Sequence, residues 1–139
     1  MNKPISFLFL FFIIINSCKQ QKEVKIEGEL KKWHKISLVF NGPETDEMDK
    51  YNPFLNYRLD VTFTNGDQNF IVPGYYAADG NAAETGASSG NKWMVNFTPN
   101  KTGQWTYKVS FKQGRDIAIL SGVSDAQSAG FMDGISGQF

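Results

Sequence analysis

The side chains best suited to chemistry are six carboxylates in two long segments between apolar runs: Glu44, Asp46, Glu47, Asp49, Asp79 and Glu84. Two carboxylates about 5 Å apart can perform retaining glycoside hydrolysis, and a pair about 6.5–9.5 Å apart the inverting reaction. Several carboxylate oxygens could instead gather around calcium, although Asp79-Gly-Asn81 is only a fragment of a calcium-loop pattern. Neither chemistry has a diagnostic spacing here. We therefore interpret these carboxylates mainly as solvated or interface charges, and we expect no catalytic residue, metal site or cofactor.

Sites that need several histidine or cysteine side chains are not expected, because His34 is the only histidine and Cys18 the only cysteine. A zinc site needs more ligands of these types. A serine nucleophile would need His34 as its base, and no serine lies in a Gly-x-Ser-x-Gly motif. With 14 basic and 14 acidic residues the chain has a formal net charge of zero, so no basic surface for nucleic acid is expected.

The amino end of the chain predicts export. Lys3 precedes an unbroken apolar run over residues 7–15, which is shorter than the roughly 20 residues of a membrane-spanning helix and typical of a signal peptide. Residues 15–18 read Ile-Asn-Ser-Cys and resemble a lipobox, in which Cys18 becomes the lipidated first residue. We therefore expect a lipoprotein anchored to a bacterial envelope membrane, on its periplasmic face or at the cell surface. The alternatives are a plain signal peptide with an incidental cysteine, or an uncleaved anchor.

A lone cysteine also bears on folding. It cannot form a disulfide within the chain, so the domain must depend on its apolar core alone. The expected organisation is a signal peptide over residues 1–17, a polar tether over 18–27 and one domain over 28–139.

Beyond the tether, apolar and polar residues alternate with a period of two. The clearest runs cover residues 57–64, 92–98 and 104–111, and weaker runs cover 34–40, 69–72 and 24–27. Such alternation predicts half-buried strands in antiparallel sheets. We expect these side chains to face the core: Ile36, Leu38, Phe40, Tyr57, Leu59, Val61, Phe63, Trp93, Val95, Phe97, Trp105, Tyr107, Val109 and Phe111. The predicted fold is all-β, an immunoglobulin-like antiparallel β-sandwich.

Loop lengths predict where a functional site would lie. Residues 65–67 and 99–103 form tight turns, whereas residues 41–56, residues 74–91 and the stretch after 112 are long. Connections between successive antiparallel strands alternate between the two ends of a sandwich. The tight turns should therefore share one end, the short-turn end, and the long segments the other, the long-loop end. Long ordered loops are usually functional or interfacial, so we expect the site at the long-loop end.

A series of separated Gly, Pro and aromatic signatures resembles one known family. In order they are Trp33-His34, Phe40-Asn-Gly-Pro43, Asn52-Pro-Phe-Leu-Asn-Tyr-Arg58, Val61-Thr-Phe-Thr64, Pro73-Gly-Tyr-Tyr-Ala-Ala-Asp-Gly80, Trp93, Phe97-Thr-Pro99 and Gly103-Gln-Trp-Thr-Tyr107. From about residue 33 onward the chain is similar to the immunoglobulin-like N-terminal domain, of unknown function, found in putative bacterial glycoside hydrolases.

This resemblance implies an accessory role without catalysis. In the family the sandwich precedes a (β/α)₈ barrel that carries the catalytic carboxylates, so the implied partner is a barrel in cis. A barrel alone needs about 250 residues. The resemblance therefore implies a truncated front piece that lacks its last strand or strands, which would leave an open sheet edge.

Five residues are the candidate interface or glycan contacts: Trp33, Tyr75, Tyr76, Asp79 and Glu84. As an alternative, the domain could be an independent carbohydrate-binding module for a polysaccharide, with Tyr75, Tyr76 and Trp33 as an exposed aromatic platform. A surface-adhesion module is a further alternative.

Overall fold

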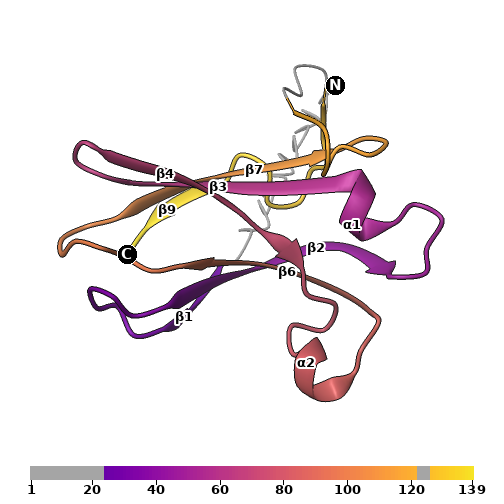
Figure 1. Ribbon diagram of the computed structural model, residues 1–139, viewed down its shortest axis with the longest axis horizontal. Coiled ribbons are helices and arrows are strands. Elements are labelled where there is room, and N and C mark those ends of the chain that lie inside the picture. The colour runs from indigo at the N-terminus through magenta and orange to yellow at the C-terminus, as the bar shows by residue number, and fades with distance from the viewer. Residues whose placement is uncertain (1–23, 122–125) are drawn as a thin grey trace, which may run out of the picture.

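The computed structural model describes residues 24–121 and 126–139 as two antiparallel sheets packed face to face (Figure 1). The signal peptide (1–17), Cys18 and the first residues of the tether lie outside the described residues. The first sheet has the order β1-β2-β6-β5, with β1 (Lys25–Gly28), β2 (Ile36–Asp46), β6 (Ser89–Phe97) and β5 (Tyr75–Tyr76). The expected strand near residues 24–27 is thus present as β1, and the first sheet begins within the segment expected as tether.

The second sheet has the order β4-β3-β7-β8, and β9 also pairs with β7. Its strands are β4 (Gln68–Pro73), β3 (Tyr57–Asn65), β7 (Thr106–Gln113), β8 (Gln127–Ser128) and β9 (Ser136–Gln138). Two helical turns, α1 (Pro53–Asn56) and α2 (Ala82–Thr85), lie between strands. The order of the strands is that of an immunoglobulin-like sandwich, which confirms the predicted fold class.

The core lies where the alternating apolar residues of the two sheets meet. Of the side chains expected to face inward, all are buried except Tyr57, which is half-buried. Phe63 of β3 stacks on Phe97 of β6, with ring centroids 4.1 Å apart and an interplanar angle of 4°. This stack joins the two sheets directly, because its rings come from facing strands.

The C-terminal segment covers one edge of β7. β8 pairs with residues 112 and 113, and β9 pairs with residues 106–108. Between them, Met132 is 1% exposed and belongs to the core. Two short strands separated by a loop therefore cover this edge of β7. In the part of the chain that the structure describes, no helix is long and apolar enough to cross a membrane.

Candidate functional site

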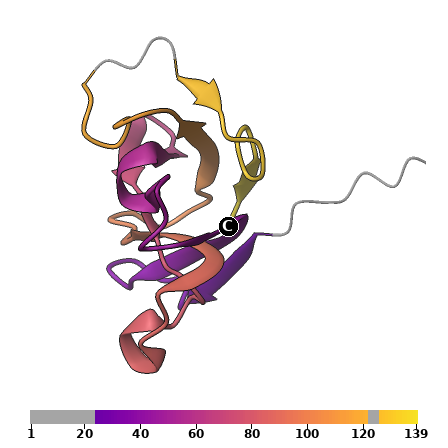
Figure 2. The ribbon, with the colours of Figure 1, turned by 90° about the vertical axis from the view of Figure 1, so that its right-hand side faces the viewer.

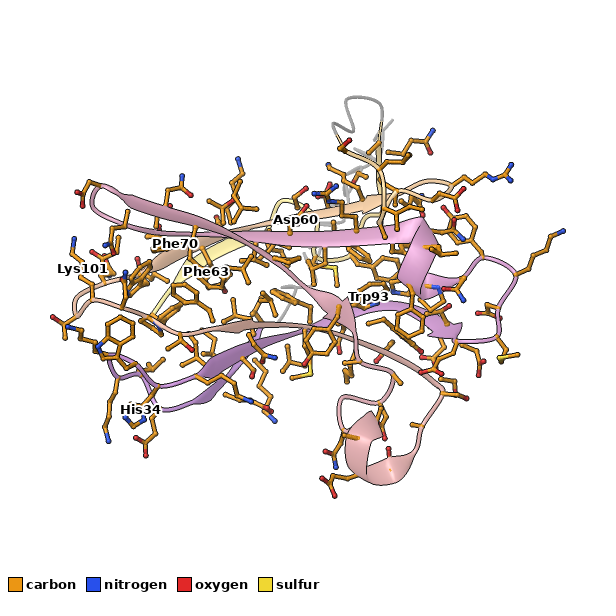
Figure 3. The ribbon with its side chains drawn as sticks, viewed as in Figure 1. His34, Asp60, Phe63, Phe70, Trp93 and Lys101 are labelled. Atoms are coloured by element: carbon orange, nitrogen blue, oxygen red, sulfur yellow. The ribbon has the colours of Figure 1, made fainter. Side chains whose placement is uncertain are left out.

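The two tight turns meet at the short-turn end, as expected. Lys101 Nζ lies 3.5 Å from Asp67 Oδ1, and Asn65 Nδ2 donates to the carbonyl of Thr102 at 3.3 Å. Gly66, in the β3–β4 turn, has φ +62°, a left-handed value that glycine adopts without strain. Figure 3 places Lys101 at this end of the sandwich.

The three long segments meet at the opposite end, which confirms the predicted long-loop end. The amide of Ala118 donates to the carbonyl of Leu55 at 3.0 Å, which joins the stretch after β7 to α1. The amide of Glu47 donates to the carbonyl of Ser88 at 3.0 Å, which joins the end of β2 to the segment before β6. Figure 2 views the molecule from this end, with α1 over the sandwich and α2 projecting beyond the first sheet.

The long-loop end exposes six large apolar side chains. We call this set the apolar end patch: Met48, Tyr51, Phe54, Leu55, Ile119 and Leu120, each at least 40% exposed. The hydrogen bond between Ala118 and Leu55 brings its two chain segments together, and Tyr51 and Leu120 line one hollow. Large exposed apolar side chains gathered at one end of a domain are typical of an interaction site.

The start of α1 explains why two members of the patch point outward. Asn52 caps the helix, its Oδ1 accepting from the amide of Phe54 at 2.9 Å, and Pro53 follows at a position that proline favours. Pro53 and Asn56 are the buried residues of α1, which leaves Phe54 and Leu55 toward solvent.

Beside Phe54 the structure has a notch of about 200 Å³, where the chain crosses from β4 to β5. The aromatic residues that line it are Phe54, Tyr57, Tyr75, Tyr76 and Trp93. Arg58 and Asp60 also line it, and Arg58 Nε donates to Asp60 Oδ2 at 2.7 Å. Because Arg58 and Asp60 alternate with the buried Leu59 and Val61 along β3, their ion pair lies on the outer face of the second sheet.

Two of the predicted contacts, Tyr75 and Tyr76, are neighbours in β5 and point to opposite faces. Tyr75 is 43% exposed, and its hydroxyl accepts from Asn96 Nδ2 at 3.3 Å on the outer face of the first sheet. Tyr76 is only 5% exposed, and its hydroxyl donates to the carbonyl of Thr45. Burial raises the pKa of Tyr76, and Asp46 and other nearby carboxylates add to this. The prediction of Tyr76 as an exposed contact is therefore corrected: it is a core residue that ties the long segments together.

The other predicted contacts do not join the apolar end patch. Trp33 is 65% exposed but lies at the short-turn end, where its amide donates to the carbonyl of Pro99 at 2.8 Å. Glu84 is exposed on α2. Asp79 accepts from Thr85 Oγ1 and from the amide of Asn81, both at 2.7 Å. These hydrogen bonds, that of Thr85 first, hold the pKa of Asp79 below its usual value.

The carboxylates at the end of β2 accept hydrogen bonds from residues of their own loop. Asp49 Oδ2 accepts from Thr45 Oγ1 and from the amide of Asp46, both at 2.9 Å, and Asp46 Oδ1 accepts from the amide of Met48 at 2.8 Å. Within residues 24–121 and 126–139, no three His, Cys, Asp or Glu side chains are grouped so that they could hold a metal ion.

The residues that make up the patch and the notch were not among the predicted contacts, apart from Tyr75 and Tyr76, which line the notch. One signal for them was available: Asn52-Pro53 is a helix-start signature, and Phe54 and Leu55 follow it inside an otherwise polar segment. The sequence could not predict that Arg58 lies at the notch, because the notch forms where the chain crosses from β4 to β5.

No curated protein matches the chain. One similar solved structure is a putative glycoside hydrolase from Bacteroides vulgatus, with 25% identity and a TM-score of 0.49 over 78% of this chain. The match covers 15% of that protein, so this chain spans a small part of its length. A family model described as a domain of unknown function, DUF5060, matches residues 29–112, which is more than half of the chain. The chain therefore belongs to the DUF5060 family of domains of unknown function.

Proposed function

We propose that this chain is a non-catalytic accessory domain of a glycoside hydrolase and that its apolar end patch packs against the catalytic barrel. The observation that carries the proposal is the exposure of six large apolar side chains on the loops of one end. Burying apolar surface is worth about 25 cal/mol per Å² removed from water, so an exposed patch favours a partner. The family signatures quoted above supply the class of partner.

The carboxylates of the long-loop end support a role without catalysis. Asp46, Asp49 and Asp79 each accept hydrogen bonds from their own loops, which is a structural use of the charge. A glycosidase pair would instead present two carboxyl groups to a cleft at one of the two separations that hydrolysis requires.

The first test is the DNA that follows the codon for Phe139. We expect a glycoside hydrolase barrel there, in frame or after a frameshift. With the barrel expressed separately, calorimetric titration with this chain should give saturable binding. The variant Leu55→Asp/Ile119→Asp should abolish binding, because it places two charges in the apolar end patch.

A matched control variant replaces the same residue types, one leucine and one isoleucine, outside the apolar end patch. Leu30 and Ile71 are 61% and 71% exposed and lie outside the patch, so Leu30→Asp/Ile71→Asp should bind like the unmodified chain. Equal binding by both double variants would show that docking does not use the patch. A region without a barrel, or a barrel that does not bind, would remove the proposed partner.

The proposal places this domain at a bacterial envelope membrane through a lipid on Cys18. The lipobox-like residues 15–18 support that placement. Metabolic labelling with a fatty-acid analogue should modify the unaltered chain and not a Cys18→Ser variant. Equal labelling of both would exclude Cys18 as the anchor.

The alternative of an aromatic platform for polysaccharide is not favoured by the geometry. Tyr76 is buried, whereas Trp33 and Tyr75 are exposed. The three rings therefore form no common surface.

A further inference from the structure

We propose that the short-turn end of the domain rests on an anionic lipid surface, which it contacts through the β1–β2 turn (residues 29–35). This inference deepens the proposed placement at an envelope membrane and rests on it for the nearness of lipid. The β1–β2 turn lies at the opposite end of the sandwich from the apolar end patch. A domain that rests on a membrane in this way keeps the patch free for its partner.

The indole of Trp33 is exposed to solvent on a strained backbone. Trp33 is 65% exposed and has φ 66°, a left-handed value that is uncommon for a bulky residue. Its amide donates to the carbonyl of Pro99 at 2.8 Å, which fixes the turn against the neighbouring loop. Leu30, in the same turn, is 61% exposed, and neither side chain belongs to the core. Backbone strain that brings no packing in the core is typical of a functional position.

The β1–β2 turn is also basic. All of its residues are exposed, and three lysines (Lys31, Lys32 and Lys35) outnumber its one acid, Glu29, which gives it a formal charge of +2. Lys31 Nζ lies 2.8 Å from Glu29 Oε2. Within residues 24–121 and 126–139, Lys32 and Lys35 form no ion pair. Figure 3 shows His34 of this turn at the same end of the sandwich as Lys101. An excess of positive charge at this end, in a chain with a formal net charge of zero, favours an anionic partner.

A tryptophan next to lysines suits the boundary between water and lipid. Tryptophan is enriched at that boundary because its ring is apolar while its N–H group can remain hydrogen-bonded. Lysines close to a membrane are attracted by anionic headgroups. Lys32 Nζ lies 5.4 Å from the centre of the Trp33 ring, so the ring and the charge would contact the same small area of the surface.

The predicted lipid anchor can reach the same surface. Lys25, the first residue of β1, follows Cys18 by seven residues, and seven residues span at most about 25 Å. From Lys25 to Gly28 the strand covers about 10 Å before the turn begins. A lipid on Cys18 and the ring of Trp33 can therefore lie in one membrane plane.

The test couples the thiol of Cys18, the only cysteine of the full chain, to a maleimide phospholipid. This coupling holds the chain at vesicles whether or not a cell lipidates it, so failure of this proposal is distinguishable from failure of the proposed anchor. The vesicles contain phosphatidylglycerol and phosphatidylcholine in equal parts, with brominated acyl chains that quench tryptophans entering the bilayer. We expect quenching in the unmodified chain and none in Trp33→Phe, because Trp93 and Trp105 are 2% and 1% exposed.

Two pairs of lysines test the role of charge. Lys32→Gln/Lys35→Gln should lower the ratio of docked to undocked molecules about 25-fold, since each lysine near an anionic surface contributes a factor of about five. Lys50→Gln/Lys108→Gln removes two exposed lysines from other parts of the surface and should leave the quenching unchanged. Emission from the unmodified chain that is no more quenched than that of Trp33→Phe would overturn the proposal. Equal effects of the two lysine pairs would also overturn it, as would equal quenching on vesicles of phosphatidylcholine alone.

Discussion

The indole of Trp93 packs so closely on Gly42 that a Cβ atom at residue 42 would overlap its Cδ1 and Nε1 atoms. Gly42 lies where the pairing of β2 with β6 shifts register, between Asn41 and Thr45. Trp93 itself is 2% exposed and in contact with the rings of Tyr57, Tyr76 and Phe111. The glycine therefore allows the largest core side chain to fit beneath an irregular strand.

Gly42→Ala should destabilise the domain by about 1–3 kcal/mol, because the added methyl group must displace the indole from a packed core. Urea unfolding followed by tryptophan fluorescence measures this. Gly114→Ala is the control, since a Cβ there would meet only Ile117 at an ordinary 3.8 Å. Equal unfolding midpoints for the two variants would contradict the close packing at Gly42.

Tyr76→Phe should lower the free energy of unfolding by about 1–2 kcal/mol, because the hydroxyl is buried against the carbonyl of Thr45. Amide exchange should also become faster near Thr45 and Gly90, whose carbonyls both lie within reach of the hydroxyl. Tyr75→Phe removes a hydroxyl at a half-exposed position and should change neither quantity. A larger effect for Tyr75→Phe would reverse the assignment of the two rings.

Asp133, between β8 and β9, ties the C-terminal segment to β7. Its Oδ1 accepts from the amide of Phe111 at 2.7 Å, and its Oδ2 accepts from Lys112 Nζ at 2.9 Å and from the hydroxyl of Ser128. Burial raises the pKa of Asp133, but the hydrogen bonds from Ser128, Phe111 and Lys112 outweigh it and hold the pKa below its usual value.

Because the pKa of Asp133 is lower in the folded state, its carboxylate adds stability at neutral pH. That contribution should be lost as the pH falls below the ordinary value of 3.8 toward the lower value in the folded state. Asp133→Asn should cost about 1–2 kcal/mol at neutral pH and flatten the acid limb of the stability profile. Asp67→Asn, at a 92% exposed carboxylate, is the control; an unchanged acid limb in Asp133→Asn would refute the assignment.

We predict that Asp79 stabilises the loop around α2 through its hydrogen bonds. Asp79→Ala removes the acceptors of Thr85 and of the amide of Asn81, so hydrogen exchange at Asn81 should accelerate while the global unfolding midpoint stays unchanged. Glu84→Ala, on the exposed surface of α2, should alter neither measurement. If Glu84→Ala accelerated exchange as much as Asp79→Ala, the prediction that Asp79 stabilises this loop would be wrong.

The strands were predictable because alternation reports which face of a sheet is buried, as Val95 and Phe97 illustrate. The meeting of the long segments was predictable from the antiparallel order of the strands. Which of Tyr75 and Tyr76 is buried could not be predicted from alternation, because a strand of two residues is too short to show a period. Its register settles the matter: Tyr76 lies opposite Trp93 and therefore shares its buried face.

The end of the sheet was harder to predict. Residues 126–139 are rich in small and polar residues and show no alternating pattern. They join the sheet through backbone pairing with β7 and through single anchors such as Met132. Backbone pairing of this kind depends on the neighbouring strand and leaves little signal in the segment itself.

The backbone of Phe139 pairs with that of Trp105 through two hydrogen bonds, of 2.9 and 3.0 Å. Residue 139 therefore lies at the short-turn end, a strand length of roughly 27 Å from the apolar end patch for the eight residues of β7. Immobilising the protein through a tag placed after Phe139 would orient every molecule with its patch and notch toward the solution. A covalent fusion meant to bring another domain onto the patch would need a connector of about eight or more extended residues running back along the sandwich.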